Sequence, residues 1–468
     1  MSTVPMTQPP LWTKAQPWLI ASVTFAILCL VAYWGGAARI DARFWTGVVI
    51  MSALVLAFGA VTWWLFLSPV PAGKKVRLPG LSPTVRQAVA FLATISNLMF
   101  IAGGNWDEAW HRRFGVGAAI NDFFWQPHLM IYGSMALTAL FAIGGLLQLL
   151  RGRGDIRLRF RAEPMIGLLA LTSAFMAFSA PSDAVWHQIF GLDITAWSLP
   201  HVLLATSGAL VMLTTAAMHL AQRPATGWRG LGGLSLSEAL AGLMLGASIV
   251  LFTLIAATEW ESITAIGVGL PAAFWSRPEW LYPVVLLSLA SLLGHIALHA
   301  TKRVGFATLV MLVALGLRWS LMSLAGLTVA QQGVPVTANL LLLLPALALD
   351  GWYRLRRGEP ESSGTLVGGA LVSTTFGLLT ILPLIATTMV FPRVNAATIP
   401  PMILFGLLMG LWFAWTGSGV GRWLGSLGAG QEKAATLNPR AVWVGASALV
   451  LLALFTVVYM LTATLPTV

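Results

Sequence analysis

The feature that most constrains this chain is a succession of long apolar segments separated by short polar loops. A helix needs about 18 or more mostly apolar residues to cross a hydrocarbon core roughly 30 Å thick. Hydrophobic residues make up 57% of the 468 positions and charged residues only 9%, which excludes an ordinary soluble domain. The sequence therefore predicts an all-α polytopic membrane helix bundle of about thirteen spans, embedded in a lipid bilayer. The spans are expected at 17–37, 46–68, 84–104, 128–150, 164–182, 200–221, 236–258, 280–301, 304–327, 335–353, 364–391, 399–417 and 440–463.

Lysine and arginine are concentrated in every second loop between the predicted spans. Basic residues in short loops stay on the cytoplasmic side of a bacterial-type cytoplasmic membrane. The pattern predicts a cytoplasmic N-terminus and places the intervening loops on the exterior or periplasmic side. The net charge of +11 is accounted for by the basic loops, and no basic cluster interleaved with aromatic residues indicates a nucleic-acid partner. The basic loops contain Arg77, Arg157, Arg229, Lys302, Arg356 and Lys433.

Three exterior loops carry copies of one motif, in which an acid is followed by a Trp-His pair and later by a Pro-His pair. The first acids of the copies, Asp107, Asp183 and Glu259, lie 76 residues apart each time. This regular interval predicts three helix-loop-helix repeats. The full copies are Asp107, Trp110, His111 and Pro127-His128, then Asp183, Trp186, His187 and Pro200-His201, and the third keeps only the carboxylates Glu259, Glu261 and Glu279.

The repeats predict where each motif residue lies on its helices. An acid and a histidine four residues later share one face of a helix, here at the outer end of the first helix of each repeat. The Pro-His pair opens the returning helix, because proline is tolerated in a first helical turn. The acid and both histidines can then meet where the two helix ends approach each other. The predicted organisation is an N-terminal two-span segment at 1–83, three repeats at 84–301 (84–150, 164–221 and 236–301) and a C-terminal helical scaffold at 302–468.

The motif residues are of the types that bind transition metals. Carboxylate oxygen and imidazole nitrogen suit copper, zinc and non-haem iron, whereas the single cysteine, Cys29, cannot form an all-sulfur site. One acid and two histidines leave a coordination position open, as catalytic sites do. The acid could instead be a partner that fixes the imidazole tautomer, and the third copy is a hard-oxygen site or no site. The candidate metal ligands are Asp183, His187 and His201 in copy two and Asp107, His111 and His128 in copy one.

The second copy, DAVWHQIFGLDITAWSLPH at 183–201, resembles the metal-binding segment of one membrane subunit of the particulate methane and ammonia monooxygenases. In that subunit family an Asp, a His four residues later in an Asp-x-x-Trp-His-Gln run, and a second His after a proline bind copper near the outer membrane face. The resemblance implies that Asp183, His187 and His201 are copper ligands. It implies a second, weaker set in the first copy.

The resemblance also implies a function. The chain would be a subunit of an oxygen-activating monooxygenase for small apolar substrates, with other membrane subunits or further copies of itself as partners. A non-catalytic copper-binding or delivery protein is the alternative with the same site. A proton- or cation-coupled transporter is a third reading, in which Asp107, Asp183 and Glu259 act as relays. Bis-histidine haem binding is less favoured, because the motif histidines lie at helix ends.

Two further groups of residues receive structural interpretations. The tryptophans of the motif loops lie where helices meet the exterior surface, and an aromatic belt is expected there. His219, His295 and His299 lie on the opposite halves of their spans, near basic loops. For the pair His295 and His299 we expect a structural role at the membrane interface.

Overall fold

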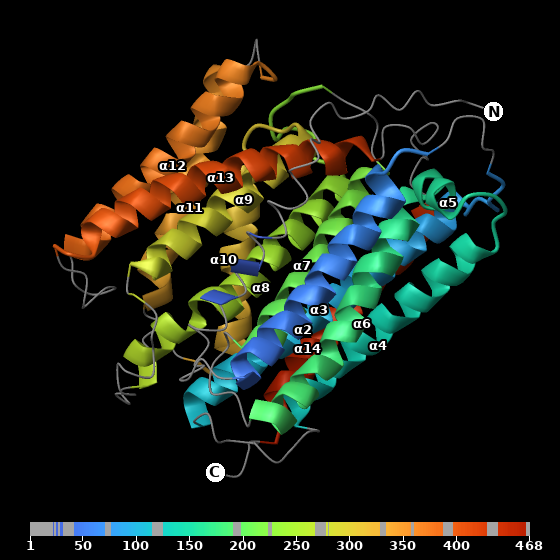
Figure 1. Cartoon of the computed structure of the whole chain (residues 1–468), viewed down its shortest axis with the longest axis horizontal. Coiled ribbons are helices and arrows are strands. Elements are labelled where there is room, and N and C mark those ends of the chain that lie inside the picture. The colour runs from blue at the N-terminus through green and yellow to red at the C-terminus, as the bar shows by residue number, and fades with distance from the viewer. Residues whose placement is uncertain are drawn as a thin grey trace.

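The protein is described by a computed structural model that covers most of the membrane-embedded chain. The described residues are 42–70, 76–114, 125–190, 198–222, 227–266, 278, 280–327, 334–356, 360–386, 396–427 and 439–464, with isolated positions between 22 and 30. Over these residues the elements are helices, which confirms the all-α prediction (Figure 1). They are α2 (Ala42–Thr62), the π-helical turn η1 (Trp63–Leu67), α3 (Pro83–Phe114), α4 (Gln126–Leu150), α5 (Ile156–Ala162), α6 (Pro164–Phe190), α7 (Leu199–Leu220), α8 (Leu236–Ile266), α9 (Leu281–Thr301), α10 (Phe306–Leu324), α11 (Val334–Leu355), α12 (Ser363–Ala386), α13 (Ile399–Ser426) and α14 (Pro439–Leu461).

The helices have the length and apolarity of membrane spans. Within the described ranges ten of them can cross a bilayer, and eleven can if the bent pair α5 and α6 forms one span. The chain is thus an integral membrane protein. Every predicted span from 46–68 onward falls on a helix, whereas most of 17–37 lies outside the described residues. Large apolar side chains remain exposed on α2, α12, α13 and α14, as expected for faces that contact lipid.

The basic loops that the structure describes lie at one end of the helix bundle. Arg77 and Arg153 exchange backbone hydrogen bonds of 3.1 and 2.8 Å, which joins the loop before α3 to the loop after α4. Arg229 bonds in the same way to Lys302 and Val304 on the loop after α9. Because consecutive helices run in opposite directions, the three motif loops lie at the other end. The side of the membrane that each end faces stays a prediction.

The helix pairs α3 and α4, α6 and α7, and α8 and α9 repeat one design. Asp107, Asp183 and Glu259 each lie seven residues before the last residue of their helices, which end at Phe114, Phe190 and Ile266. His128 and His201 are each the third residue of the returning helix. The predicted placement is therefore confirmed for the three acids and for the two Pro-His pairs, whereas Pro278 of the third copy lies before the start of α9 at Leu281. With 32 residues at 1.5 Å per residue, α3 is about 48 Å long, which exceeds the roughly 30 Å thickness of a hydrocarbon core.

Glycines bring α13 unusually close to α9. A Cβ atom at Gly421 would lie 2.8 Å from the carbonyl oxygen of Ile296, and one at Gly425 would lie 2.8 Å from that of Ala300. Gly417 makes the same kind of approach to Leu292. Small residues at every fourth position let two membrane helices pack backbone to backbone. Helix α13 is consequently fixed against the third repeat.

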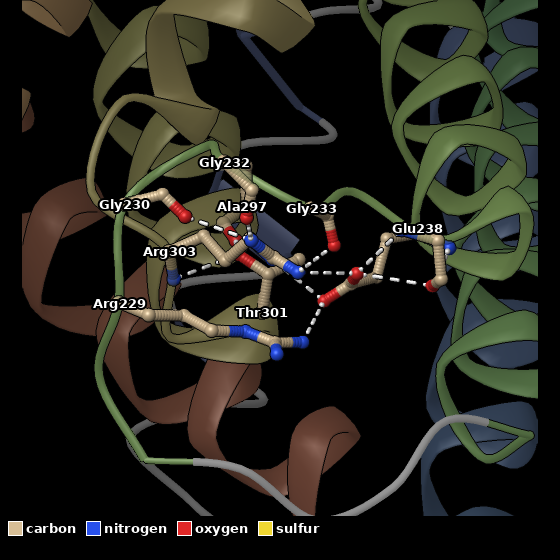
Figure 2. A network of polar contacts seen from close by, with 9 residues as sticks. Arg229, Gly230, Gly232, Gly233, Glu238, Ala297, Thr301 and Arg303 are labelled. Carbon is tan, nitrogen blue, oxygen red and sulfur yellow. Dashed lines mark hydrogen bonds and ion pairs between the residues drawn. The ribbon is translucent and has the colours of Figure 1, made fainter.

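A buried ion pair joins the first turn of α8 to the loop after α9 (Figure 2). The Arg303 and Glu238 side chains are fully buried, with Nη2 and Oε2 2.7 Å apart. Each of the five N–H groups of the guanidinium has an acceptor: the two carboxylate oxygens and the carbonyls of Gly230, Gly232 and Gly233. This complete set of partners compensates for the removal of both charges from water.

Replacing Gly421 by alanine tests the contact between α9 and α13. The added methyl overlaps the Ile296 carbonyl, and such overpacking costs about 1–3 kcal/mol in the free energy of unfolding. Gly419 is the matched control, because a Cβ there meets no atom within 4 Å. Gly419→Ala should leave the protein as stable or stabilise it by up to about 1 kcal/mol. Thermal unfolding in detergent micelles measures both, and equal midpoints for the two variants would contradict this packing.

Glu238→Gln tests the buried ion pair. The change leaves the Arg303 charge buried without a counter-charge, which should lower the free energy of unfolding by about 3–5 kcal/mol. Glu361→Gln is the control, because its ion pair with Lys302 is exposed, and should cost less than about 1 kcal/mol. Both costs are measured by denaturant titration of the purified protein. Similar losses in the free energy of unfolding from the two variants would show that burial does not determine how much the ion pair between Glu238 and Arg303 contributes to stability.

Candidate functional site

The acid and both histidines of the first motif copy come together at the motif end of the bundle. Asp107 and His111 lie in the last turns of α3, and His128 lies in the first turn of α4. The Nε2 atom of His128 is 3.2 Å from Asp107 Oδ1, and the Nε2 atom of His111 is 3.8 Å from the same oxygen. Two ring nitrogens from different helices thus point at one carboxylate oxygen.

Local sequence explains how the two helix ends meet. Asp107 and His111 are one turn apart on α3 and share a face. Pro127 occupies the first turn of α4, and Trp125 precedes it with an extended backbone. Gly103, one turn before Asp107, allows the close approach, since a Cβ there would lie 3.0 Å from the carbonyl oxygen of Pro127. A larger residue at this position would separate α3 from the start of α4.

The Asp107 carboxylate is partly shielded and has several hydrogen-bonding neighbours. Its side chain is 23% exposed, and those of His111 and His128 are 31% and 30% exposed. The Trp125 indole Nε1–H donates a 2.9 Å hydrogen bond to Oδ1. The Nδ1 atom of His111 is buried and has no hydrogen-bond partner among the described residues. The cluster is therefore accessible to small solutes, although most of the surface of each imidazole ring is covered by protein.

The three donors are close to the spacing of metal ligands. Two ligand atoms at 2.0–2.1 Å from a tetrahedral ion lie about 3.3 Å apart, and the observed separations are 3.2 and 3.8 Å. Within the described part of the chain, no group of three or more His, Cys, Asp or Glu side chains is arranged so that it could hold a metal ion as it stands. An ion at this position would have to draw the His111 ring inward by roughly 0.5 Å, because that ring stands further from Oδ1 than the 3.3 Å spacing requires. As they stand, the three residues form a polar cluster that can share protons.

Tryptophans form a buried wall behind this cluster. Trp110 packs edge-on against both Trp106 and Trp125, with ring centroids 5.1 and 5.4 Å away. Trp106 in turn meets Tyr459 of α14. The belt interpretation is wrong for Trp110 and Trp125, which are only 3% and 4% exposed. Their helices pack against neighbours at this level, so the rings face protein and not the lipid headgroups.

The second and third copies are described only in part. Asp183 and His187 lie on α6 at positions equivalent to those in the first copy, but their side chains are outside the described set. His201 is described and lies partly exposed in the first turn of α7. Glu259 and Glu261 are on α8, again without described side chains, and Glu279 is outside the described residues. Convergence of these two sets stays a prediction.

Three buried histidines form contacts that the sequence interpretation missed. His219, His295 and His299 are 1%, 0% and 2% exposed, so all three rings are enclosed by protein. His219 Nε2 lies 2.8 Å from the Thr94 hydroxyl, and His299 Nε2 lies 3.2 Å from the Tyr353 hydroxyl. One pattern in the sequence could have indicated that His295 and His299 are enclosed. Polar residues recur at helical spacing on one face of this apolar span, at Ser288, Ser291, His295 and His299.

Comparison of the chain with protein-family models, with curated proteins and with solved structures gives no match. The site is consequently interpreted from its own geometry and from the motif.

A double-mutant cycle tests the hydrogen bond between Trp125 and Asp107. A hydrogen bond to a charged group contributes about 1.5–3 kcal/mol, so Trp125→Phe and Asp107→Ala should be coupled by about that amount in the free energy of unfolding. Trp125→Phe also removes part of the apolar surface of the indole. This loss is the same whether position 107 is Asp or Ala, so it cancels in the coupling energy. Chemical denaturation of the four proteins gives the coupling. Costs that add to within about 0.5 kcal/mol would contradict the bond.

Proposed function

We propose that this integral membrane protein binds a transition-metal ion, copper in particular, through Asp107, His111 and His128 at the motif end of the bundle. The observation that carries the proposal is the convergence of two imidazole Nε2 atoms on one carboxylate oxygen, at 3.2 and 3.8 Å. The residues come from two helices fixed by close packing, so the ion would find its ligands nearly in place.

The composition of the donor set supports copper. Imidazole is a good ligand for copper, and copper(II) is bound more tightly than the other divalent first-row metals by a given nitrogen and oxygen site. Three protein ligands leave room for water or dioxygen, and the partial exposure of the cluster gives access to small molecules. Zinc and iron suit the same donors and are the competitors that a binding experiment must include.

The helix positions of the repeat support a second, equivalent site. Asp183, His187 and His201 occupy the same places on α6 and α7 that the first set occupies on α3 and α4. The resemblance of 183–201 to the copper-binding segment of the particulate monooxygenases favours the same metal there. Two sites, one in each complete motif copy, are proposed.

The proposed activity is that of a subunit of a monooxygenase for small apolar substrates. A bound copper ion would supply dioxygen activation, and the wall of Trp106, Trp110 and Trp125 would offer an apolar surface beside it. Partner subunits or further copies of the chain belong to this proposal. Copper storage or delivery uses the same ligands without turnover, so oxidation of a small hydrocarbon by copper-loaded membranes supplied with dioxygen and a two-electron donor distinguishes the two.

Copper content tests the site directly. Protein purified in detergent, loaded with copper and desalted should retain about one to two ions per chain, and the double variant His111→Ala/His128→Ala should lose about one. Electron paramagnetic resonance of the copper(II) form should show nitrogen hyperfine splitting that weakens in this variant. His219→Ala is the matched control, because it also removes an imidazole but lies near Thr94, at the opposite end of its helix from the motif.

Two results would overturn the proposal. One is a double variant that keeps the full copper load and an unchanged spectrum. The other is a wild-type protein that retains no copper after desalting. Loss of only one ion from the double variant, with the second removed by changing His187 and His201, would support two sites.

A further inference from the structure

Four aromatic side chains form a continuous series between the candidate metal site and α14. In order they are Trp125, Trp110, Trp106 and Tyr459, which together form the aromatic series. The centroids of successive rings are 5.4, 5.1 and 5.4 Å apart, and successive ring planes meet at 87°, 79° and 86°. In this edge-to-face geometry each ring touches the next. Indole and phenol lose an electron more easily than the other aromatic side chains, so these contacts join groups that can exchange electrons.

The first ring of the series contacts all three residues of the candidate metal site. The Trp125 indole N–H donates to Asp107 Oδ1 at 2.9 Å. The centroid of its ring lies 5.0 Å from that of His111 and 5.6 Å from that of His128. An oxidant held by these three residues therefore has an electron donor in direct contact with its ligands.

The two middle rings are enclosed by protein. Trp110 is 3% exposed and Trp106 is 0% exposed, so solutes do not reach them. The Trp106 Nε1–H is also buried without a hydrogen-bond partner among the described residues, which is uncommon for a buried donor. Loss of an electron makes an indole N–H strongly acidic, but this one has no group to receive its proton. Oxidised Trp106 is therefore neutralised by an electron from a neighbouring ring and not by loss of a proton.

The last ring can lose a proton. Tyr459 is partly exposed and lies in the last turn of α14, which ends at Leu461. The free carbonyls at a helix end need water or other donors, which places the end of a membrane span at the bilayer surface. An oxidised phenol can release its proton to water there and become a neutral radical. Positive charge therefore moves from the enclosed rings to Tyr459.

We infer that the aromatic series carries oxidising equivalents from the candidate metal site to Tyr459 at the surface of the protein. In each step one electron moves from a ring to the ring before it. The oxidant at the site gains one electron, and Tyr459 finally loses one electron to Trp106 and its phenol proton to water. The identity of the oxidant rests on the proposed function: it is the copper ion, left strongly oxidising when dioxygen has been activated without a substrate. The series would then protect the ligands from oxidation.

A photochemical oxidant tests the aromatic series without copper. A ruthenium polypyridyl label is attached to the cysteine of the His111→Cys variant, in a Cys29→Ser background that removes the single native thiol. Position 111 is partly exposed, and its native ring lies beside Trp125. A flash of light with a cobalt(III) electron acceptor produces ruthenium(III), which oxidises both indole and phenol. Electron paramagnetic resonance of rapidly frozen samples should show a tyrosyl radical.

Two variants should abolish the tyrosyl radical. Tyr459→Phe removes only a hydroxyl group, so the fold is kept and a tryptophan radical should replace the tyrosyl signal. Trp106→Phe interrupts the series, because ruthenium(III) does not oxidise phenylalanine. Trp280→Phe is the control for a lost indole, since Trp280 stacks on Phe405 outside the series, and it should leave the signal unchanged.

Tyr132 is the competing end point, because its ring lies 5.7 Å from that of His128. Tyr132→Phe should leave the tyrosyl signal unchanged. Loss of the signal in this variant, its survival in Tyr459→Phe, or an undiminished signal in Trp106→Phe would overturn the inference. Absence of any tyrosyl radical in the labelled parent protein would also overturn it. Because the label supplies the oxidant, these results do not depend on whether the native site binds copper.

Discussion

A polar group buried in the bundle needs hydrogen-bond partners within the protein, because neither the packed interior nor the hydrocarbon around it supplies them. Arg303 satisfies this requirement with five acceptors, and Asp350 satisfies it by accepting from Gly305 and Thr308 at the start of α10. The same requirement separates the structure into two ends. Basic loops with paired backbones lie at one end, and the described cluster of carboxylate, imidazole and indole lies at the other.

Much of the fold followed from the sequence, because its strongest signals are local. Apolar length predicted every span that falls within the described residues, and the 76-residue interval predicted the helix pairs. The motif placed Asp107, His111 and His128 together because helix periodicity and a proline at a helix start both act over a few residues. The alternation of basic and non-basic loops along the chain predicted that the basic loops lie at the same end of the bundle.

The features that the sequence did not predict depend on contacts between helices that are far apart along the chain. The burial of the tryptophan wall requires α14 to meet α3, which no local pattern indicates. His295 and His299 were assigned to the interface from their distance to Lys302, but α13 covers them because its glycines permit close approach. Whether a histidine in a span is exposed or enclosed is decided by the partner helix.

The fixed offset between each acid and the end of its helix restricts how such a chain can change. Inserting one residue between Gly103 and Asp107 would turn the carboxylate by about 100° around the axis of α3, away from His128. Length variation is tolerated in the connecting loops but not within these final turns. Divergence of the repeats must therefore proceed by replacement of side chains, as in the third copy, where Pro278-Glu279 stands in place of the Pro-His pair.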